Sequence, residues 1–164
     1  MQRILQAVRE ARGKERLLIT IDGPCGSGKT TLARRLAETL GAPLVHTDDF
    51  VVPHARKTPE RLAIPGGNED VERLLAEFVL PWKRTGHTAY RPYAYREDRL
   101  LEPVPVPDAP YAVLEGAYCD LPPLRAEADV RVFLRIGREE QLARLRAREG
   151  EKWMPLFLSR WIPL

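Results

Sequence analysis

One short segment combines residue types that can surround a chain of phosphate groups. Residues 23–30 read Gly-Pro-Cys-Gly-Ser-Gly-Lys-Thr and satisfy the pattern G-x-x-x-x-G-K-[ST] at every fixed position. Glycines permit the backbone conformations that turn several N–H groups toward an anion. Lys29 can reach the outer phosphates, and the Thr30 hydroxyl can bind Mg²⁺. We therefore predict that ATP and Mg²⁺ bind here, through Gly23, Pro24, Cys25, Gly26, Ser27, Gly28, Lys29, Thr30 and Thr31.

The sequence on either side of this loop predicts the elements that such a loop requires. Residues 17–21, Leu-Leu-Ile-Thr-Ile, form an apolar, partly β-branched run that is typical of a buried parallel strand. Residues 29–40 place leucines at four-residue spacing and end at Gly41, which predicts a helix. A helix that begins at the loop directs the positive end of its dipole at the phosphates. This setting favours a ligand-binding loop over a glycine-rich turn without a ligand.

The rest of the chain alternates between strand-like and helix-like segments. Apolar runs at 43–46, 111–114 and 129–136 are predicted strands, and 2–12, about 70–80 and 138–149 are predicted helices. This alternation predicts an α/β protein with the three-layer P-loop NTPase fold, in which helices flank a mainly parallel sheet. A chain of 164 residues is one domain's worth, spanning 1–164. Ligands of such sheets bind outside the carboxyl ends of the strands.

Prolines and glycines divide the middle of the chain. Residues 51–68 read as a loop, and the helix that starts near Asn68 or Asp70 is expected to end at Pro81. Farther on, four prolines are expected to resist regular structure: Pro103, Pro105, Pro107 and Pro110. We expect residues of about 51–108 to form a substrate-binding insert.

Composition argues against several classes of protein. The 26 basic and 23 acidic residues are intermixed, whereas a nucleic-acid-binding protein gathers its basic residues on one stripe. No run approaches the roughly 18 apolar residues of a membrane span, and the first ten residues lack a signal-peptide core. We therefore expect a cytoplasmic protein that binds neither nucleic acid nor membrane. Cys25 and Cys119 are expected to be free thiols.

Acidic residues follow two of the predicted strands. Asp48 and Asp49 come just after residues 43–46, and Glu115 directly follows residues 111–114. A carboxylate at the first place could accept the proton of an attacking hydroxyl or help to hold Mg²⁺, and Glu115 could bind the metal. The residues alone leave a second interpretation open, in which the aspartates cap a turn and Glu115 is a solvated loop acid.

Taken in chain order, these motifs resemble the uridine kinase and nicotinamide riboside kinase group. The resemblance covers about residues 15–150 and rests on the phosphate loop, Asp48-Asp49-Phe50, Gly67-Asn68-Glu69-Asp70, Tyr93-Ala94-Tyr95, Leu114-Glu115-Gly116 and the arginine-rich helix. It implies an ATP-dependent kinase that transfers the γ-phosphoryl group to a hydroxyl of a nucleoside-like small molecule.

The resemblance also implies roles for single residues. Asp48 is similar to the catalytic base, Asp70 to the acid that holds the ribose hydroxyls, and Tyr93 to the tyrosine that contacts the substrate base. The implied Mg²⁺ ligands are Thr30, Asp48 and Glu115. The helix at 138–150 resembles a lid whose arginines close over the phosphates: Arg144, Arg146 and Arg148. We expect Lys29, Arg144 and Arg148 to take part in catalysis.

The sequence departs from the family pattern where the acceptor would bind. Tyr93-Ala94-Tyr95 replaces Tyr-Asp-Phe, and Asp98 stands where uridine kinases have a histidine that reads the pyrimidine. Arg96 and the neighbouring tyrosines suit a flat or anionic acceptor, so uridine itself is not implied. A regulatory ATP-binding module and a kinase of another metabolite stay open as alternatives. The apolar residues 151–164 fit a truncated domain, a shortened relative or a homodimer contact.

Overall fold

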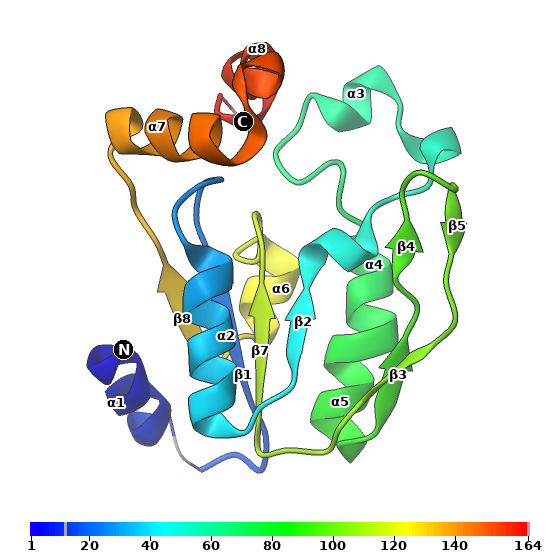
Figure 1. Ribbon diagram of the computed structural model, residues 1–164. Coiled ribbons are helices and arrows are strands. Elements are labelled where there is room, and N and C mark those ends of the chain that lie inside the picture. Colours follow the sequence, from blue (N-terminus) through cyan, green and yellow to red (C-terminus); the bar gives the residue numbers. More distant parts are fainter. Residues whose placement is uncertain (12, 164) are drawn as a thin grey trace.

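A four-stranded parallel sheet forms the centre of the protein (Figure 1). The computed structural model describes every residue except 12 and 164. The strands lie in the order β2-β7-β1-β8, as in the predicted α/β fold. Their bounds are β1 (Leu17–Asp22), β2 (Leu44–His46), β7 (Tyr111–Glu115) and β8 (Val130–Phe133).

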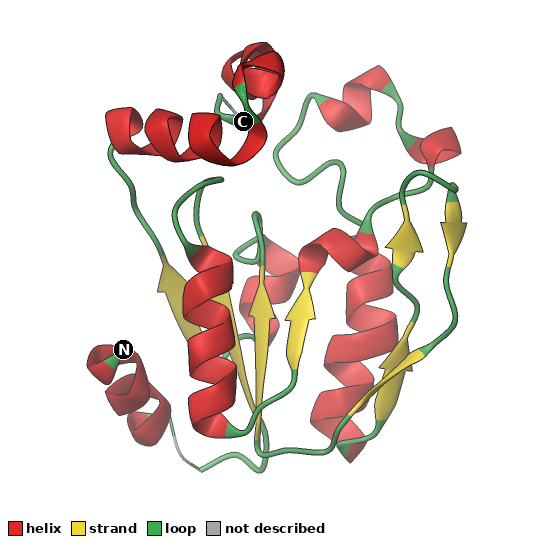
Figure 2. Ribbon diagram, in the orientation of Figure 1, coloured by secondary structure: helices red, strands yellow, loops and turns green. Residues whose placement is uncertain are grey.

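Alternate residues of β1 face two different helical layers. Leu18 belongs to one apolar cluster with Phe78 and Trp82, whereas Ile19 and Ile21 belong to another with residues of α2 (Lys29–Leu40). Figure 2 shows α2 in front of the sheet and α6 (Pro122–Glu127) behind it. Because both faces are covered, all six residues of β1 are buried, which explains its continuous apolar run. The three-layer prediction is confirmed.

The amino-terminal helix packs on the α2 side of the sheet. It is α1 (Gln2–Glu10), and its Val8 joins the cluster that contains Ile19. The sequence predicted a helix over residues 2–12, of which residue 12 lies outside the described part. None of the described helices is long and apolar enough to span a membrane.

The prediction that a helix ends at Pro81 is wrong. The helix runs through α4 (Val71–Leu74), a π turn labelled η3 (Leu75–Val79) and α5 (Leu80–Thr85). Pro81 cannot donate to the carbonyl of Glu77, and the hydroxyl of Thr88 donates to that carbonyl instead. The wider π turn makes room for the proline ring next to that replaced bond, so the helix continues.

The prediction that the later prolines resist regular structure is wrong for Pro105. It lies in β6 (Val104–Val106), which pairs antiparallel with β3 (Thr88–Tyr90). A second ribbon pairs β4 (Tyr93–Ala94) with β5 (Arg99–Leu100). In a two-stranded ribbon each strand has a free edge, where a proline leaves no hydrogen bond unmade.

Short turns and helices follow strands β2 and β8 at the carboxyl ends of the strands, which are at the top of Figure 1. After β2 the chain forms η1 (Thr47–Phe50), η2 (His54–Arg56) and α3 (Pro59–Leu62). After β8 it forms α7 (Arg138–Glu149), η4 (Glu151–Trp153), α8 (Met154–Leu156) and η5 (Phe157–Trp161). Met154 and Phe157 pack on Leu145, so part of the apolar carboxyl-terminal segment is buried within the chain.

Candidate functional site: a phosphate loop and an acidic strand edge

The glycine loop connects β1 to α2 and adopts a conformation that only glycine accepts cheaply. Gly23, Gly26 and Gly28 have φ angles of 143, 78 and 92°. A Cβ on Gly23 would lie 2.6 Å from the carbonyl oxygen of Leu134, so a side chain there would collide with the backbone. Gly28 directly precedes α2, so unpaired N–H groups of the first helical turn line the loop.

Asp22 holds the loop in place. Its carboxylate accepts hydrogen bonds from the backbone N–H groups of Gly23 (2.5 Å), Tyr118 (3.1 Å) and Asp120 (2.9 Å). These bonds tie the loop to the segment that follows β7. Sequence reasoning missed Asp22, although an acid at the end of the strand before the loop was a visible signal.

Two polar groups of the loop indicate a ligand. Lys29 Nζ donates to the carbonyl oxygens of Gly23 (2.7 Å) and Pro24 (3.1 Å). The Ser27 hydroxyl is buried and has no hydrogen-bond partner among the described residues. Because a buried unpaired hydroxyl costs free energy, a ligand oxygen in the loop would complete the site. The loop therefore fits the predicted polyphosphate.

Helix α7 lies against the loop. Gln141 Nε2 donates to the carbonyl oxygen of Cys25 at 2.9 Å, and Arg144 Nη1 donates to that of Gly26 at 3.2 Å. The other two lid arginines pair elsewhere, Arg146 with Glu151 at 3.1 Å and Arg148 with Glu149 at 2.5 Å. The structure therefore brings Arg144 into contact with the loop, whereas the described partner of Arg148 is Glu149. It adds Gln141, which sequence reasoning missed.

Thr30 and Glu115 meet at the carboxyl end of β7. Glu115 Oε1 accepts a hydrogen bond from Thr30 Oγ1 at 3.1 Å and lies 2.6 Å from His46 Nδ1. Burial acts to raise the pKa of Glu115, but the bonds from His46 and Thr30 and the nearby charges outweigh it and lower the pKa. The hydrogen bond to Glu115 raises the pKa of His46. The result is an ionised carboxylate beside a hydroxyl.

This pair has the donor chemistry that Mg²⁺ prefers. Hard cations take oxygen ligands, and Mg²⁺ at nucleotide sites is held by one or two protein groups with phosphates and water. Over residues 1–11 and 13–163 there is no group of three or more His, Cys, Asp or Glu side chains that could hold a metal ion by itself. Thr30 and Glu115 therefore fit a metal ion that also binds phosphate.

Asp48 lies at the end of β2, in the first turn of η1. The residue is exposed, but the protein around it removes enough water to raise the pKa of its carboxyl, and the charge of Glu115 adds to the rise. The charges of Lys29 and His46 oppose it. The position of Asp48 agrees with these influences, because His46 at the end of β2 is paired with Glu115 of β7. A raised pKa makes the carboxylate a stronger base, which suits a general base.

Glu69 is a further acid at this place that sequence reasoning missed as a site residue. Residues 51 and 69 form an antiparallel bridge, which brings Glu69 beside the segment that follows Asp48. Arg61 holds this loop by donating to the carbonyl oxygens of Gly67 (2.7 Å) and Glu69 (3.1 Å). Glu69 Oε2 is buried and has no partner among the described residues. Burial, followed by the charge of Asp48, raises the pKa of Glu69 to about 8, so its carboxyl is largely neutral at pH 7.

The predicted acceptor residues have partners within the insert. Asp70 caps α4 by accepting the N–H of Arg73 at 3.3 Å, and it pairs with Arg56 at 3.2 Å. Tyr93 is buried and donates its hydroxyl to Asp98. Arg96 lies exposed in the turn between β4 and β5. The structure thus engages Asp70 in a helix cap and an ion pair, whereas Glu69 keeps an oxygen with no partner among the described residues.

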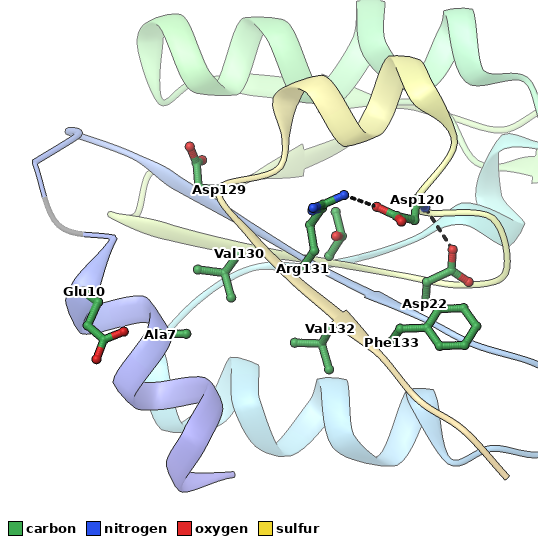
Figure 3. A pocket seen from close by; sticks show the side chains of 10 residues that line it. Ala7, Glu10, Asp22, Asp120, Asp129, Val130, Arg131, Val132 and Phe133 are labelled. Carbon is green, nitrogen blue, oxygen red and sulfur yellow. Dashed lines mark hydrogen bonds and ion pairs between the residues drawn. The ribbon is translucent and has the colours of Figure 1, made fainter.

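A pocket of about 490 Å³ lies beside the edge strand β8, and of the site residues described above only Asp22 lines it (Figure 3). Its acids already have partners, because Asp129 pairs with Lys14 at 2.5 Å and Asp120 with Arg131 at 3.2 Å. Neither the glycine loop nor Asp48, Glu69 and Glu115 line it. The chemistry of this protein therefore concentrates at the loop and the strand ends, and not at this pocket.

A comparison with known families agrees with this geometry. A family model described as an AAA domain matches residues 19–153, which is most of the chain. The chain belongs to this AAA domain family. The match includes the phosphate loop, Asp48, Glu69, Glu115 and all of helix α7.

Two solved structures share the fold. A candidate fructose transport system kinase from Silicibacter sp. TM1040 is 24% identical with a TM-score of 0.77, over 96% of this chain and 88% of that one. A candidate uridine kinase from Bacillus stearothermophilus is 22% identical with a TM-score of 0.65, over 98% of this chain and 94% of that one. These likenesses confirm the predicted uridine kinase-like P-loop fold.

Curated relatives match shorter segments. A cytidylate kinase from Nitratidesulfovibrio vulgaris is 60% identical over 30 residues, and a shikimate kinase from Symbiobacterium thermophilum is 43% identical over 61. These segments cover 18% and 37% of this chain. The chain spans 13% and 35% of the length of these two relatives.

Proposed function

We propose that this AAA domain protein is a kinase that transfers the γ-phosphoryl group of ATP to a hydroxyl of a small, nucleoside-like molecule. The observation that carries the proposal is the position of Asp48. Asp48 lies in η1 directly after β2, whose His46 is paired with Glu115 of β7, and the charges of Glu115 and Lys29 act on the pKa of its carboxyl. A general base beside a polyphosphate loop serves an attacking hydroxyl, which simple nucleotide binding does not need.

Each residue of the site has a separate role in the proposed reaction. Asp48 orients the acceptor hydroxyl and takes its proton while the acceptor oxygen forms a bond to the γ-phosphorus. The bond from that phosphorus to its bridging oxygen breaks, and ADP leaves with the electron pair. Lys29 exchanges the loop carbonyl oxygens for phosphate oxygens, and the guanidinium of Arg144 is close enough to the loop to neutralise charge. Mg²⁺, held by Thr30 and Glu115 with Asp48 nearby, would supply charge stabilisation between the phosphates.

The comparisons support the reaction type more than the acceptor. The related proteins and structures are named as kinases of cytidylate, shikimate, uridine and a fructose transport system. These acceptors differ, so the shared element is phosphoryl transfer to a small molecule. We infer a protein that acts in the cytoplasm on small molecules. A homodimer through residues 151–164, of which residue 164 lies outside the described part, stays a prediction.

A second candidate is an ATP-binding module that has no small-molecule acceptor. The description of the matching family as an AAA domain favours it, because that description names no acceptor. The buried, unpartnered carboxyl oxygen of Glu69 beside Asp48 speaks for the kinase, since a module without an acceptor has no use for it. Acceptor-dependent release of ADP distinguishes the two.

The test is a panel of nucleosides, ribosides and hydroxy acids, each incubated with ATP and Mg²⁺ while ADP is measured. A kinase releases ADP faster with its acceptor, and Asp48→Asn should then lower turnover by about 10²–10⁴ while ATP affinity stays the same. The matched control is Asp49→Asn, because Asp49 is the neighbouring acid but accepts a hydrogen bond from Tyr90 at 2.9 Å. ADP release that no acceptor stimulates, or an Asp48→Asn variant with parental turnover, contradicts the proposal.

A further inference from the structure

The loop that follows η2 carries a lysine without an acidic partner. Lys57 Nζ lies 4.4 Å from the centroid of the Tyr95 ring, and the residue is half-buried. Within the described part of the chain, no carboxylate forms an ion pair with Lys57, whereas Lys14 and Lys83 each pair with Asp129. An ammonium group that is partly removed from water and lacks a counter-ion is costly, unless a ligand brings one.

The neighbouring acids form no ion pair with this ammonium among the described residues. Asp98 is engaged elsewhere, because its Oδ1 accepts the N–H of His54 at 2.9 Å and the hydroxyl of Tyr93. Glu69 is buried and carries an oxygen with no partner among the described residues, so it forms no hydrogen bond or ion pair with Lys57 either. Lys57 therefore keeps ammonium N–H groups that no described carboxylate accepts.

A second cation adds to this positive charge. Burial lowers the pKa of Lys57, the charge of Glu69 acts against that, and the charge of Arg160 in η5 lowers the pKa further. Arg160 has no ion-pair partner within residues 1–11 and 13–163. In Figure 1 the carboxyl-terminal turns and α3 stand on opposite sides of the space above the strand ends. Lys57 follows η2 and Arg160 lies in η5, so the two cations come from segments that are far apart in the sequence.

We propose that Lys57 binds an anionic group of the phosphoryl acceptor, with Arg160 as a second cation, so that the acceptor is an alcohol carrying a carboxylate or a phosphate. This inference rests on the proposed kinase function and narrows it. The Tyr95 ring supports the ammonium through a cation–π contact and leaves its N–H groups free for anionic oxygens. The unpartnered oxygen of Glu69 offers a further polar group to the same acceptor.

The experiment uses pairs of acceptors that differ in one charged group. The pairs are ribose and ribose 5-phosphate, glycerol and glycerate, and cytidine and cytidine monophosphate, assayed with the full chain, ATP and Mg²⁺. The charged member of at least one pair should have the lower KM. Comparison of the carboxylate pair with the phosphate pairs shows which anion the site takes.

Replacement of Lys57 separates binding of the anion from catalysis. Lys57→Met should raise the KM of the charged acceptor about tenfold or more, with kcat and the KM of ATP unchanged, because a charge-assisted hydrogen bond is lost. Arg160→Met should act in the same direction and less. The matched control is Lys152→Met, since Lys152 is an exposed lysine that also lies over an aromatic ring, 5.8 Å from the centroid of Trp153.

The outcomes distinguish this inference from the proposed function. Preference for the neutral members, or equal KM changes for both members in Lys57→Met, overturns the anion site and leaves the kinase intact. If no compound stimulates ADP release, the anion site is tested by calorimetry. Ribose 5-phosphate and glycerate are titrated into the chain together with a nonhydrolysable ATP analogue. Binding that Lys57→Met abolishes supports the anion site, and no binding to the parent chain overturns it.

Discussion

The phosphate side and the acceptor side of the site differ in how completely the protein satisfies their polar groups. On the phosphate side, residues 22–31, Asp22 accepts three backbone hydrogen bonds and Lys29 donates two, leaving Ser27 as the exception. On the acceptor side, residues 48–99, Glu69 keeps a buried oxygen without a described partner and Lys57 has no described counter-ion. The difference indicates that the loop is preorganised, whereas the acceptor side depends on its ligand for completion.

This comparison predicts that replacement of the loop lysine causes the largest loss of turnover. Lys29→Ala should lower turnover by about 10²–10³ and weaken ATP binding, because the charge that compensates the outer phosphates is removed. Thermal stability should change little, since Lys29 bonds only to loop carbonyl oxygens. Turnover, ATP titration and a melting curve measure the three effects. An unchanged ATP titration would count against the loop assignment.

Asp22→Asn should show that the phosphate side stabilises the fold. The amide offers one acceptor oxygen in place of two and brings N–H groups toward backbone donors, so we expect a loss of about 1–3 kcal/mol in the free energy of unfolding. Denaturant unfolding measures it. Asp120→Asn is the matched control, because its carboxylate pairs with arginines Arg125 and Arg131 in partly exposed positions, where such pairs contribute under about 1 kcal/mol. Equal losses in both variants would refute the role of Asp22.

Glu69→Gln should stabilise the protein at about pH 8, whereas Asp22→Asn should lower the free energy of unfolding. The folded-state pKa of Glu69 is about 8, above the ordinary value of 4.5, so the folded chain binds more protons than the unfolded chain between these values. Its contribution to stability is therefore complete below about pH 4.5 and is lost as the pH rises toward 8. Glu69→Gln should remove that slope and make the protein more stable than the parent at about pH 8, by an amount on the order of a few kcal/mol at most.

Unfolding free energies measured at several pH values test this prediction. A Glu72→Gln variant is the control, because Glu72 is an exposed residue of the same segment. If the parent and Glu69→Gln lose stability in parallel between pH 5 and 8, Glu69 is not the buried acid that the acceptor side leaves unpaired.

The phosphate loop and the four strands were predictable because their signals are local. Gly23, Gly26 and Gly28 have backbone angles that favour glycine, and this requirement is visible in the loop sequence itself. The continuous apolar run of β1 indicates that the strand is buried on both faces. The errors at Pro81 and Pro105 have a different origin. Each depends on a partner distant from the proline in sequence, the Thr88 hydroxyl in one case and strand β3 in the other.

The site shows the same division. Thr30, Asp48 and Glu115 follow their predicted strands and loop, and the structure brings Thr30 and Glu115 into contact. Gln141 and Glu69 were missed because their contacts cross the fold, Gln141 to the loop carbonyl of Cys25 and Glu69 to the charge of Asp48. Leu145 of α7 packs beside Gly26 of the loop, and the adjacent Arg144 therefore contacts the loop.

The sequence by itself determined that this protein forms a glycine loop with left-handed turns after a buried strand, because those requirements fall on consecutive residues. Only the tertiary structure decided which acid stands beside Asp48 and which lysine lacks a counter-ion. Burial and pairing are properties of groups brought together from distant parts of the chain, and a pKa or a missing partner arises only where they meet.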